Sequence, residues 1–238
     1  NADRAYKTRL IRKMRAILRD RVSSGRTSMA SSSSDQHSID ERMMRRAIEV
    51  ATRSGQLGEY PYAAVIARGS RIVCESINPV RRDRDVTRHT EVVAISEAQR
   101  LLGRTSLEDC TLYVNVESCA YCCYAIRESR IGRVLFGMPS PIMGGLSRWN
   151  ILEDTGLSDR IPEVFAPPPD VVTCFLQHEA EAALRNWNPI AYEFLRSRGI
   201  FGGPLPAHVL ARPARRTTLK DGVQDFLRRH FFDRFGRK

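Results

Sequence analysis

The sequence has no apolar run near the roughly 20 residues that a membrane-spanning helix needs. It also has no secretory signal with an apolar stretch of about 7–15 residues, and no internal repeat. Hydrophobic residues make up 42% and charged residues 27% of the 238 residues, which is typical of a globular protein. A membrane-spanning protein, a collagen and a wholly disordered chain are therefore excluded. The length suits one domain, alone or with tails.

Charge is the one unusual feature of the composition, with a formal net charge of +11. Residues 1–28 hold nine basic and two acidic residues (+7), and residues 203–238 hold nine and three (+6). The remaining 20 basic and 22 acidic residues lie in 29–202, which sums to −2. The first end suits a solvated tail, a targeting peptide, or an arm for nucleic acid or a membrane surface. The second suits a helix packed on its own domain or on a second subunit, or a segment whose phenylalanines stack on bases or dock a partner. We predict tails at 1–37 and 203–238 around a domain at 38–202.

The apolar pattern of the middle segment predicts alternating strands and helices. A capping box at Ser38 and Glu41 predicts the start of a helix. Two apolar runs around Gly69-Ser70 predict a β-hairpin. Further strands are expected at 112–116, 134–136 and 171–174, and further helices at 92–102, 120–129, 176–187 and 190–198. The expected fold class is therefore α/β, with helices packed on a mixed sheet.

Six cysteines are present, and three of them crowd into the stretch VESCAYCCYAI. Cys119 and Cys122 are three residues apart, after a predicted strand and at the start of a predicted helix. A helix N-terminus stabilises thiolate, the form of cysteine that binds metal. Such a pair is typical of a thioredoxin-like redox site, of half a structural zinc site, or of two thirds of a catalytic zinc site.

His89 and Glu91 favour the catalytic zinc site. Zinc held by one imidazole and two thiolates keeps its fourth position for water and lowers the pKa of that water. Hydrolytic deamination also needs a carboxylate beside the metal to move protons, and Glu91 stands two residues after His89. This His-x-Glu pattern with a later Cys-x-x-Cys is the signature of zinc deaminases. A structural site would need a fourth ligand, such as Cys123 or Cys110.

Residues from about 39 to 187 resemble the cytidine deaminase-like superfamily, in the branch of guanine deaminases and tRNA adenosine deaminases. The segments that carry the resemblance are PYAAV (61–65), Asn78, DVTRHTE (85–91), ESCAYC (117–122) and RIGRVLFG (130–137). The chain departs from the family pattern at Ala63, Thr90 and Ser118, where glycine, alanine and proline are usual. None of these changes removes a ligand or the acid/base.

The resemblance implies a three-layer α/β/α fold with a central mixed sheet of about five strands. It implies that His89, Cys119 and Cys122 bind Zn²⁺ and that Glu91 is the catalytic acid/base. It also implies that Asn78 hydrogen-bonds the base and that backbone around Ala64 touches it. Further implications are a homodimer and a cytoplasmic enzyme without a membrane partner.

The substrate expected first is a guanine-type purine base or nucleoside, because the near-neutral segment 29–202 has few charges to spare for phosphates. The alternatives are adenosine in tRNA, deaminated to inosine, or cytosine or another aminated heterocycle. A non-enzymatic structural-zinc scaffold is a further alternative. For a small substrate, the segment after Trp187 is expected to close the pocket.

Overall fold

The computed structural model describes residues 31–211, in two compact units that divide after Asp40. Most of the predicted tails 1–37 and 203–238 lies outside the described residues, except 31–37 and 203–211, where Val209 is buried in the core. The secondary-structure elements are α2 (Ser31–Gln56), β1 (Ala63–Arg68), β2 (Arg71–Ile77), α3 (Val80–Asp83), α4 (Thr90–Leu102), β3 (Thr111–Val116), α5 (Ala120–Glu128), β4 (Arg133–Met138), η1 (Ile151–Glu153), α6 (Thr155–Arg160), β5 (Asp170–Val172), α7 (Gln177–Trp187), α8 (Pro189–Ser197) and α9 (Ala207–Leu210). No helix of the described part is long and apolar enough to cross a membrane.

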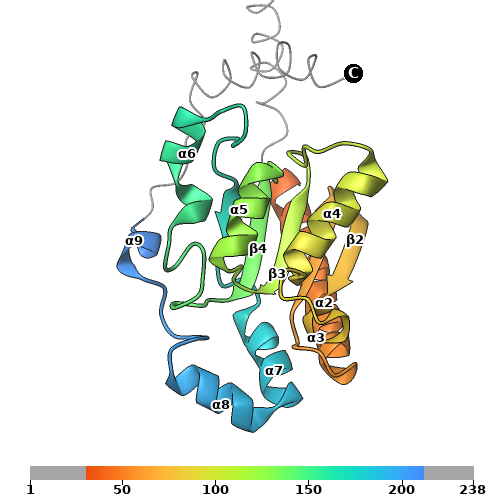
Figure 1. Cartoon of the computed structure of the whole chain (residues 1–238), viewed down its shortest axis with the longest axis vertical. Coiled ribbons are helices and arrows are strands. Elements are labelled where there is room, and N and C mark those ends of the chain that lie inside the picture. The colour runs from red at the N-terminus through yellow and green to blue at the C-terminus, as the bar shows by residue number, and fades with distance from the viewer. Residues whose placement is uncertain (1–30, 212–238) are drawn as a thin grey trace, which may run out of the picture. The chain divides into compact units, whose positions relative to one another are not determined.

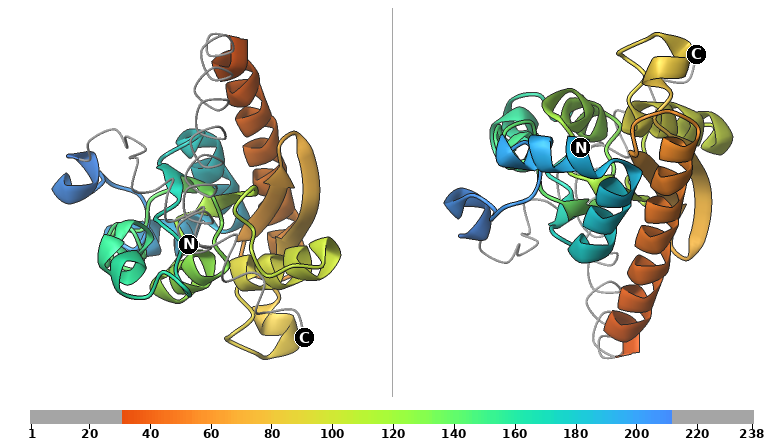
Figure 2. Two further views of the ribbon diagram at one scale, coloured as in Figure 1. Left: turned by 90° about the horizontal axis from the view of Figure 1, so that it is seen from above. Right: turned by 90° about the horizontal axis from the view of Figure 1, so that it is seen from below.

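The strands form one mixed sheet with the order β2-β1-β3-β4-β5. Strand β1 is antiparallel to both β2 and β3, whereas β3, β4 and β5 are parallel. Within the large unit, α4 and α5 cover one face of the sheet, and α7 and the later part of α2 cover the other (Figures 1 and 2). The expected three-layer α/β/α fold on a five-stranded mixed sheet is confirmed.

Both faces of β1 are buried, which explains why this strand is a continuous apolar run. Successive side chains of a strand point to opposite faces. Ala64 and Ile66 therefore join the core under α4 and α5, while Ala63 packs with Val50 and Ala51 of α2. A charged residue introduced into this strand would have no solvent on either face of the sheet.

The capping-box prediction at Ser38 is wrong. Helix α2 begins at Ser31, and Ser38 lies inside it, where its hydroxyl donates a hydrogen bond to the carbonyl oxygen of Ser34 at 3.1 Å. The Glu41 carboxylate accepts a hydrogen bond from Nη1 of Arg45, one turn further along the helix, at 3.2 Å. A serine inside a helix can bond to the carbonyl four residues earlier, so the pattern does not identify a helix start uniquely.

Candidate active site

Two helices begin at the same edge of the sheet and bring the predicted ligands together. His89 is the N-cap residue of α4, and Cys119 is the N-cap residue of α5. Cys122 lies in the first turn of α5 and is fully buried. This edge is the carboxyl end of the parallel strand β3, where open α/β sheets form their binding crevices.

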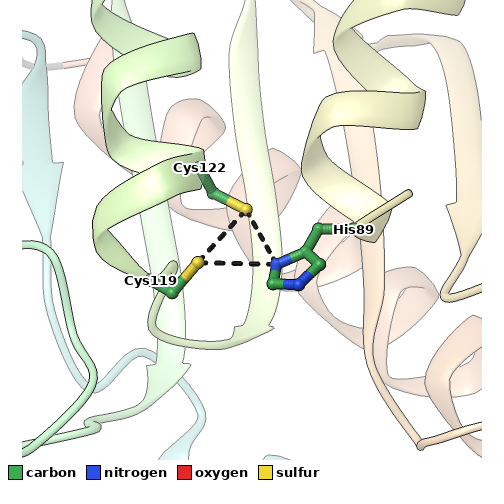
Figure 3. Close-up of side chains that lie close together, drawn as sticks. All are labelled: His89, Cys119 and Cys122. Carbon is green, nitrogen blue, oxygen red and sulfur yellow. Dashed lines mark hydrogen bonds between the residues drawn. The ribbon is translucent and has the colours of Figure 1, made fainter. Parts of the chain in front are cut away.

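The three ligand atoms fit a single metal ion. The Sγ atoms of Cys119 and Cys122 lie 3.6 Å apart, and each lies 3.4 Å from Nδ1 of His89 (Figure 3). Tetrahedral zinc with ordinary bond lengths would separate two sulfurs by about 3.8 Å and a sulfur from a nitrogen by about 3.6 Å. Among the described residues, these three form the group of histidines, cysteines and carboxylates that could hold a metal.

The surroundings of Cys119 favour its thiolate form. Hydrogen bonds from Cys122 and from His89 lower the pKa of the Cys119 thiol to about 4, against the opposing effect of burial. The backbone N–H groups at the start of α5 act in the same direction, because the amino end of a helix stabilises negative charge. A thiolate and an imidazole at this spacing are what a zinc ion requires.

Glu91 lines the same pocket as His89 and Cys119. It lies in the first turn of α4 and is 7% exposed. Burial raises the pKa of its carboxyl group above the usual range. A carboxyl group whose pKa is raised keeps its proton more readily than an exposed one, which suits a residue that both accepts and donates protons.

The pocket has a volume of about 220 Å³. Asn78 lines it and is 4% exposed. Its backbone nitrogen donates to the hydroxyl of Ser54, while its side-chain amide has no hydrogen-bond partner within the described part of the chain. A buried amide without a protein partner is a ready donor and acceptor for a bound ring.

Ala64, the other predicted contact residue, is fully buried in the core under α4 and α5, and it is Ala63 that lines the pocket. The side chain of Asn115 holds this part of the wall. Its Oδ1 accepts a hydrogen bond from the Ala63 nitrogen at 2.9 Å, and its Nδ2 donates to the Pro61 carbonyl at 2.8 Å. Asn115 was not singled out from the sequence, where it lies unremarked inside a buried strand.

Glu117 is a second residue that the sequence analysis missed. The residue is 5% exposed, and its carboxylate accepts hydrogen bonds from three backbone nitrogens of the loop that follows β4. Met143 of that loop lines the pocket. Glu117 therefore fixes both the approach to Cys119 and the loop opposite. The signal in the sequence that could have indicated its role is its position two residues before Cys119, the first ligand of the Cys-x-x-Cys pair.

Phe201 is a third. It lines the pocket from the segment after α8 and is 6% exposed. The Gly202 nitrogen donates to the Pro139 carbonyl at 2.9 Å, and the Ser140 hydroxyl donates to the Ile200 carbonyl at 2.8 Å. The segment after Trp187 thus forms one wall of the pocket.

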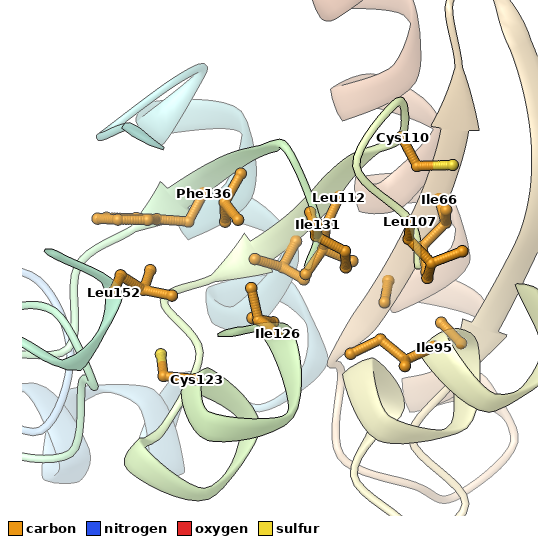
Figure 4. Close-up of a cluster of buried hydrophobic side chains, with 14 of the residues drawn as sticks. Ile66, Ile95, Leu107, Cys110, Leu112, Cys123, Ile126, Ile131, Phe136 and Leu152 are labelled. Carbon is orange, nitrogen blue, oxygen red and sulfur yellow. The ribbon is translucent and has the colours of Figure 1, made fainter. Parts of the chain in front are cut away.

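Cys123 is separate from the cluster. It is fully buried, and its thiol donates a weak hydrogen bond to the Ser118 carbonyl at 3.4 Å. Figure 4 shows it among buried apolar side chains that include Ile126 and Leu152. Cys110 also lies in this core. Neither cysteine supplies the fourth ligand that a closed structural zinc site would need.

The chain resembles known deaminases in sequence and in structure. The family model for the cytidine and deoxycytidylate deaminase zinc-binding region matches residues 37–138. The chain is 37% identical to the tRNA-specific adenosine deaminase of Aquifex aeolicus over 128 residues. This aligned stretch covers 53% of this chain and 85% of that protein.

Two solved structures are also similar. One comes from a study of A-to-I editing by tRNA:A34 deaminases, with 29% identity, a TM-score of 0.55, and coverage of 60% of this chain and 99% of that chain. The other is a guanine deaminase from Nitrosomonas europaea, with 22% identity, a TM-score of 0.53, and coverage of 62% and 83%. The second likeness shows the fold alone.

The family match covers the stretch that holds His89, Cys119 and Cys122. The relative from Aquifex aeolicus is matched over most of its length. The chain therefore belongs to the cytidine deaminase-like superfamily, in the branch of guanine deaminases and tRNA adenosine deaminases, and is a zinc-dependent hydrolytic deaminase.

Proposed function

We propose that this chain deaminates adenosine in tRNA to inosine and releases ammonia. The observation that carries the proposal is the placement of Glu91 in the pocket wall beside His89 and Cys119, in a chain 37% identical to a tRNA-specific adenosine deaminase. Support for a guanine-type purine, which the net charge of 29–202 favoured, is weaker, because the guanine deaminase structure is 22% identical.

In this proposal His89, Cys119 and Cys122 hold the zinc ion. Bound zinc supplies a Lewis acid that lowers the pKa of water towards neutrality. These residues would supply three ligands, and a catalytic zinc site keeps its fourth position for water or substrate.

Glu91 moves the protons. It takes one proton from the attacking water and delivers it to the ring nitrogen, and then takes the second proton from the same oxygen and delivers it to the leaving amino group. A bond forms between the water oxygen and C6 of adenine, and the bond from C6 to the exocyclic nitrogen breaks. The side chain of Asn78 orients the ring by hydrogen bonds, since its amide has no partner in the described part of the chain.

The pocket volume of about 220 Å³ suits one base. A base inside a duplex cannot reach such a site, so the reacting nucleotide must be unstacked or lie in a single-stranded loop. Sequence-specific RNA recognition mostly targets single-stranded loops, whose bases can be unstacked and bound one by one. The anticodon loop of a tRNA is such a loop.

A substrate panel tests the proposal. Zinc-loaded protein is given a tRNA transcript, adenosine, guanine, guanosine, cytosine and cytidine at equal concentrations, and ammonia release is followed. We expect kcat/KM for the tRNA to exceed that for any free base or nucleoside by at least about 100-fold, because the polynucleotide adds phosphate and stacking contacts. Faster turnover of guanine than of tRNA would overturn the proposal in favour of the purine alternative.

A further inference from the structure

A row of aromatic side chains runs from the pocket to the surface. The Phe201 ring meets the Tyr62 ring edge-on, with centroids 6.0 Å apart, and Tyr62 stacks on Tyr60 at 6.0 Å and an angle of 21°. Exposure rises along the row, from 6% at Phe201 to 43% at Tyr60. All three side chains line the pocket. One wall of the pocket is therefore aromatic and continues outside it.

Tyr60, at the outer end of the row, is held firmly. The hydroxyl of the buried Ser54 donates to the Tyr60 carbonyl oxygen at 2.7 Å. The Trp187 ring meets the Tyr60 ring edge-on, with centroids 6.1 Å apart. Trp187 in turn packs directly against Gly55 of α2. An exposed tyrosine that is fixed on two sides loses little conformational entropy when a second ring stacks on it.

Arginine caps the outer end of the row. The guanidinium carbon of Arg81 lies 5.9 Å from the centroid of the Tyr60 ring, and its Nη1 donates to the Gly58 carbonyl at 2.9 Å. The carboxylate of Glu59 accepts hydrogen bonds from the backbone nitrogens of Arg81 and Arg82, at 3.0 and 2.6 Å. The loop that carries Tyr60 and the start of α3 therefore form one connected surface.

The residues around this surface are basic. Arg81, Arg82, Arg84 and Arg88 are all exposed. Asp83 pairs with both Arg82 and Arg88, and the four arginines outnumber the two acidic residues of residues 81–88, Asp83 and Asp85. Within the described part of the chain, Arg84 makes no ion pair. The net charge of −2 over residues 29–202 thus includes a locally basic segment, residues 81–88, which lies in the chain between two residues of the pocket lining, Val80 and His89.

We infer that Tyr60 and Arg81 form a subsite for the nucleotide next to the one that reacts: its base stacks on Tyr60, and its phosphate meets Arg81. The inference rests on the proposed function, because it requires a polynucleotide substrate. Aromatic faces beside arginines are how proteins hold unstacked bases of any identity. A free base that fills the pocket would leave this subsite unused.

The test compares two exposed aromatic residues that both lie under an arginine. Tyr60 lies under Arg81 and lines the pocket, whereas Phe194 on α8 lies 4.4 Å from the guanidinium carbon of Arg198 and is outside the lining. The variants are Tyr60→Ala, Tyr60→Phe and Phe194→Ala. Each is assayed with an anticodon stem-loop RNA and with adenosine, and its affinity for the stem-loop is measured by fluorescence anisotropy.

We expect Tyr60→Ala to lower kcat/KM for the stem-loop and the affinity for it by about 5- to 150-fold, the range of one base–aromatic stack. The loss of kcat/KM on adenosine should be at least about fivefold smaller than the loss on the stem-loop, because a free nucleoside has no neighbouring base to stack on Tyr60. Tyr60→Phe keeps the ring and should retain most of the activity on the stem-loop, and Phe194→Ala should match the unmodified protein on both substrates. An equal loss on adenosine would show that Tyr60 only shapes the pocket, which overturns the inference. So would a Tyr60→Ala variant that binds and deaminates the RNA normally.

These outcomes separate the inference from the proposed function. If the unmodified protein converts the stem-loop and Tyr60→Ala does so equally well, the subsite is wrong and the function stands. If the unmodified protein converts free guanine but no RNA, the function fails and the subsite fails with it. Photo-crosslinking gives an independent readout, since 5-iodouridine placed beside the reacting adenosine should crosslink to Tyr60 and not to Phe194.

Discussion

Ser147 donates two hydrogen bonds to the carboxylate of Glu117, one from its backbone nitrogen at 2.6 Å and one from its hydroxyl at 2.7 Å. The backbone nitrogens of Ser140 and Leu146 donate to the same carboxylate at 2.8 and 3.1 Å. Gly145, between them, donates to the Ser118 carbonyl at 2.8 Å. One buried carboxylate thus ties the loop after β4 to the residue that precedes Cys119.

Glu117→Gln should destabilise the fold. Each carboxylate oxygen accepts hydrogen bonds from two donors of the loop. In glutamine an NH₂ group replaces one of these oxygens, so two donors of the loop would face another donor. A buried donor left without an acceptor costs about 1–3 kcal/mol. Urea unfolding should show a loss of this size, and Glu128→Gln, an exposed glutamate at the end of α5, should stay within about 0.5 kcal/mol of the unmodified protein. Equal stability of the two variants would contradict the role given to Glu117.

Zinc content should follow the geometry of the cluster. We expect one zinc ion per chain in the unmodified protein, and a loss of most zinc in His89→Ala, Cys119→Ala and Cys122→Ala, because two ligands do not hold zinc tightly. Cys123→Ala is the matched control, since its thiol bonds to the Ser118 carbonyl. Inductively coupled plasma mass spectrometry measures the zinc content of the unmodified protein and of the four variants. Loss of zinc in Cys123→Ala would show that this thiol is a ligand.

Asn78→Ala should weaken substrate binding and leave zinc in place. The variant removes a buried amide that lines the pocket but does not belong to the metal cluster. Loss of its hydrogen bonds to the ring should lower kcat/KM by about 5- to 150-fold, which corresponds to about 1–3 kcal/mol. Asn186→Ala, an exposed asparagine on α7, is the control. Unchanged kinetics in Asn78→Ala would exclude a contact with the base.

Gly55→Ala should destabilise the protein although Gly55 lies in a helix. Alanine in a helix interior is ordinarily more stable than glycine by about 0.5–1 kcal/mol. Here a Cβ atom would lie 2.6 Å from Cδ1 of Trp187, so the indole ring must move. Thermal unfolding should therefore show a lower Tm than in the unmodified protein. A higher Tm would mean that Trp187 gives way freely and does not support Tyr60.

Much of the fold could be predicted from apolar runs, because these report burial directly. The hairpin, the strands and helices α4, α5, α7 and α8 lie within a few residues of their expected places, whereas α2 begins seven residues before Ser38. Strand β4 extends through Gly137, where a side chain would collide with the Asn115 carbonyl and Ala180. The short helices α3, α6 and α9 were not predicted, since four to six residues are too few to show a helical period.

The site was predictable where its residues are close in sequence. His89 and Glu91 share one motif, and Cys119 and Cys122 share another. Phe201 was not predictable, because it reaches the pocket through hydrogen bonds between segments some sixty residues apart. Net charge is a weak guide to the substrate for a similar reason, since a sum over 29–202 does not show where individual arginines lie. The homodimer and the cytoplasmic location stay predictions.

The most direct test of the account is inosine formation in tRNA by the unmodified protein and by Glu91→Gln, both shown to contain zinc. Nucleosides from the digested tRNA are quantified by mass spectrometry. The account predicts that inosine appears as adenosine is lost with the unmodified protein. With Glu91→Gln, turnover should fall by at least about 100-fold, since proton transfer by a positioned side chain contributes about 10²–10⁴-fold. Inosine formed at an undiminished rate by zinc-loaded Glu91→Gln would contradict it.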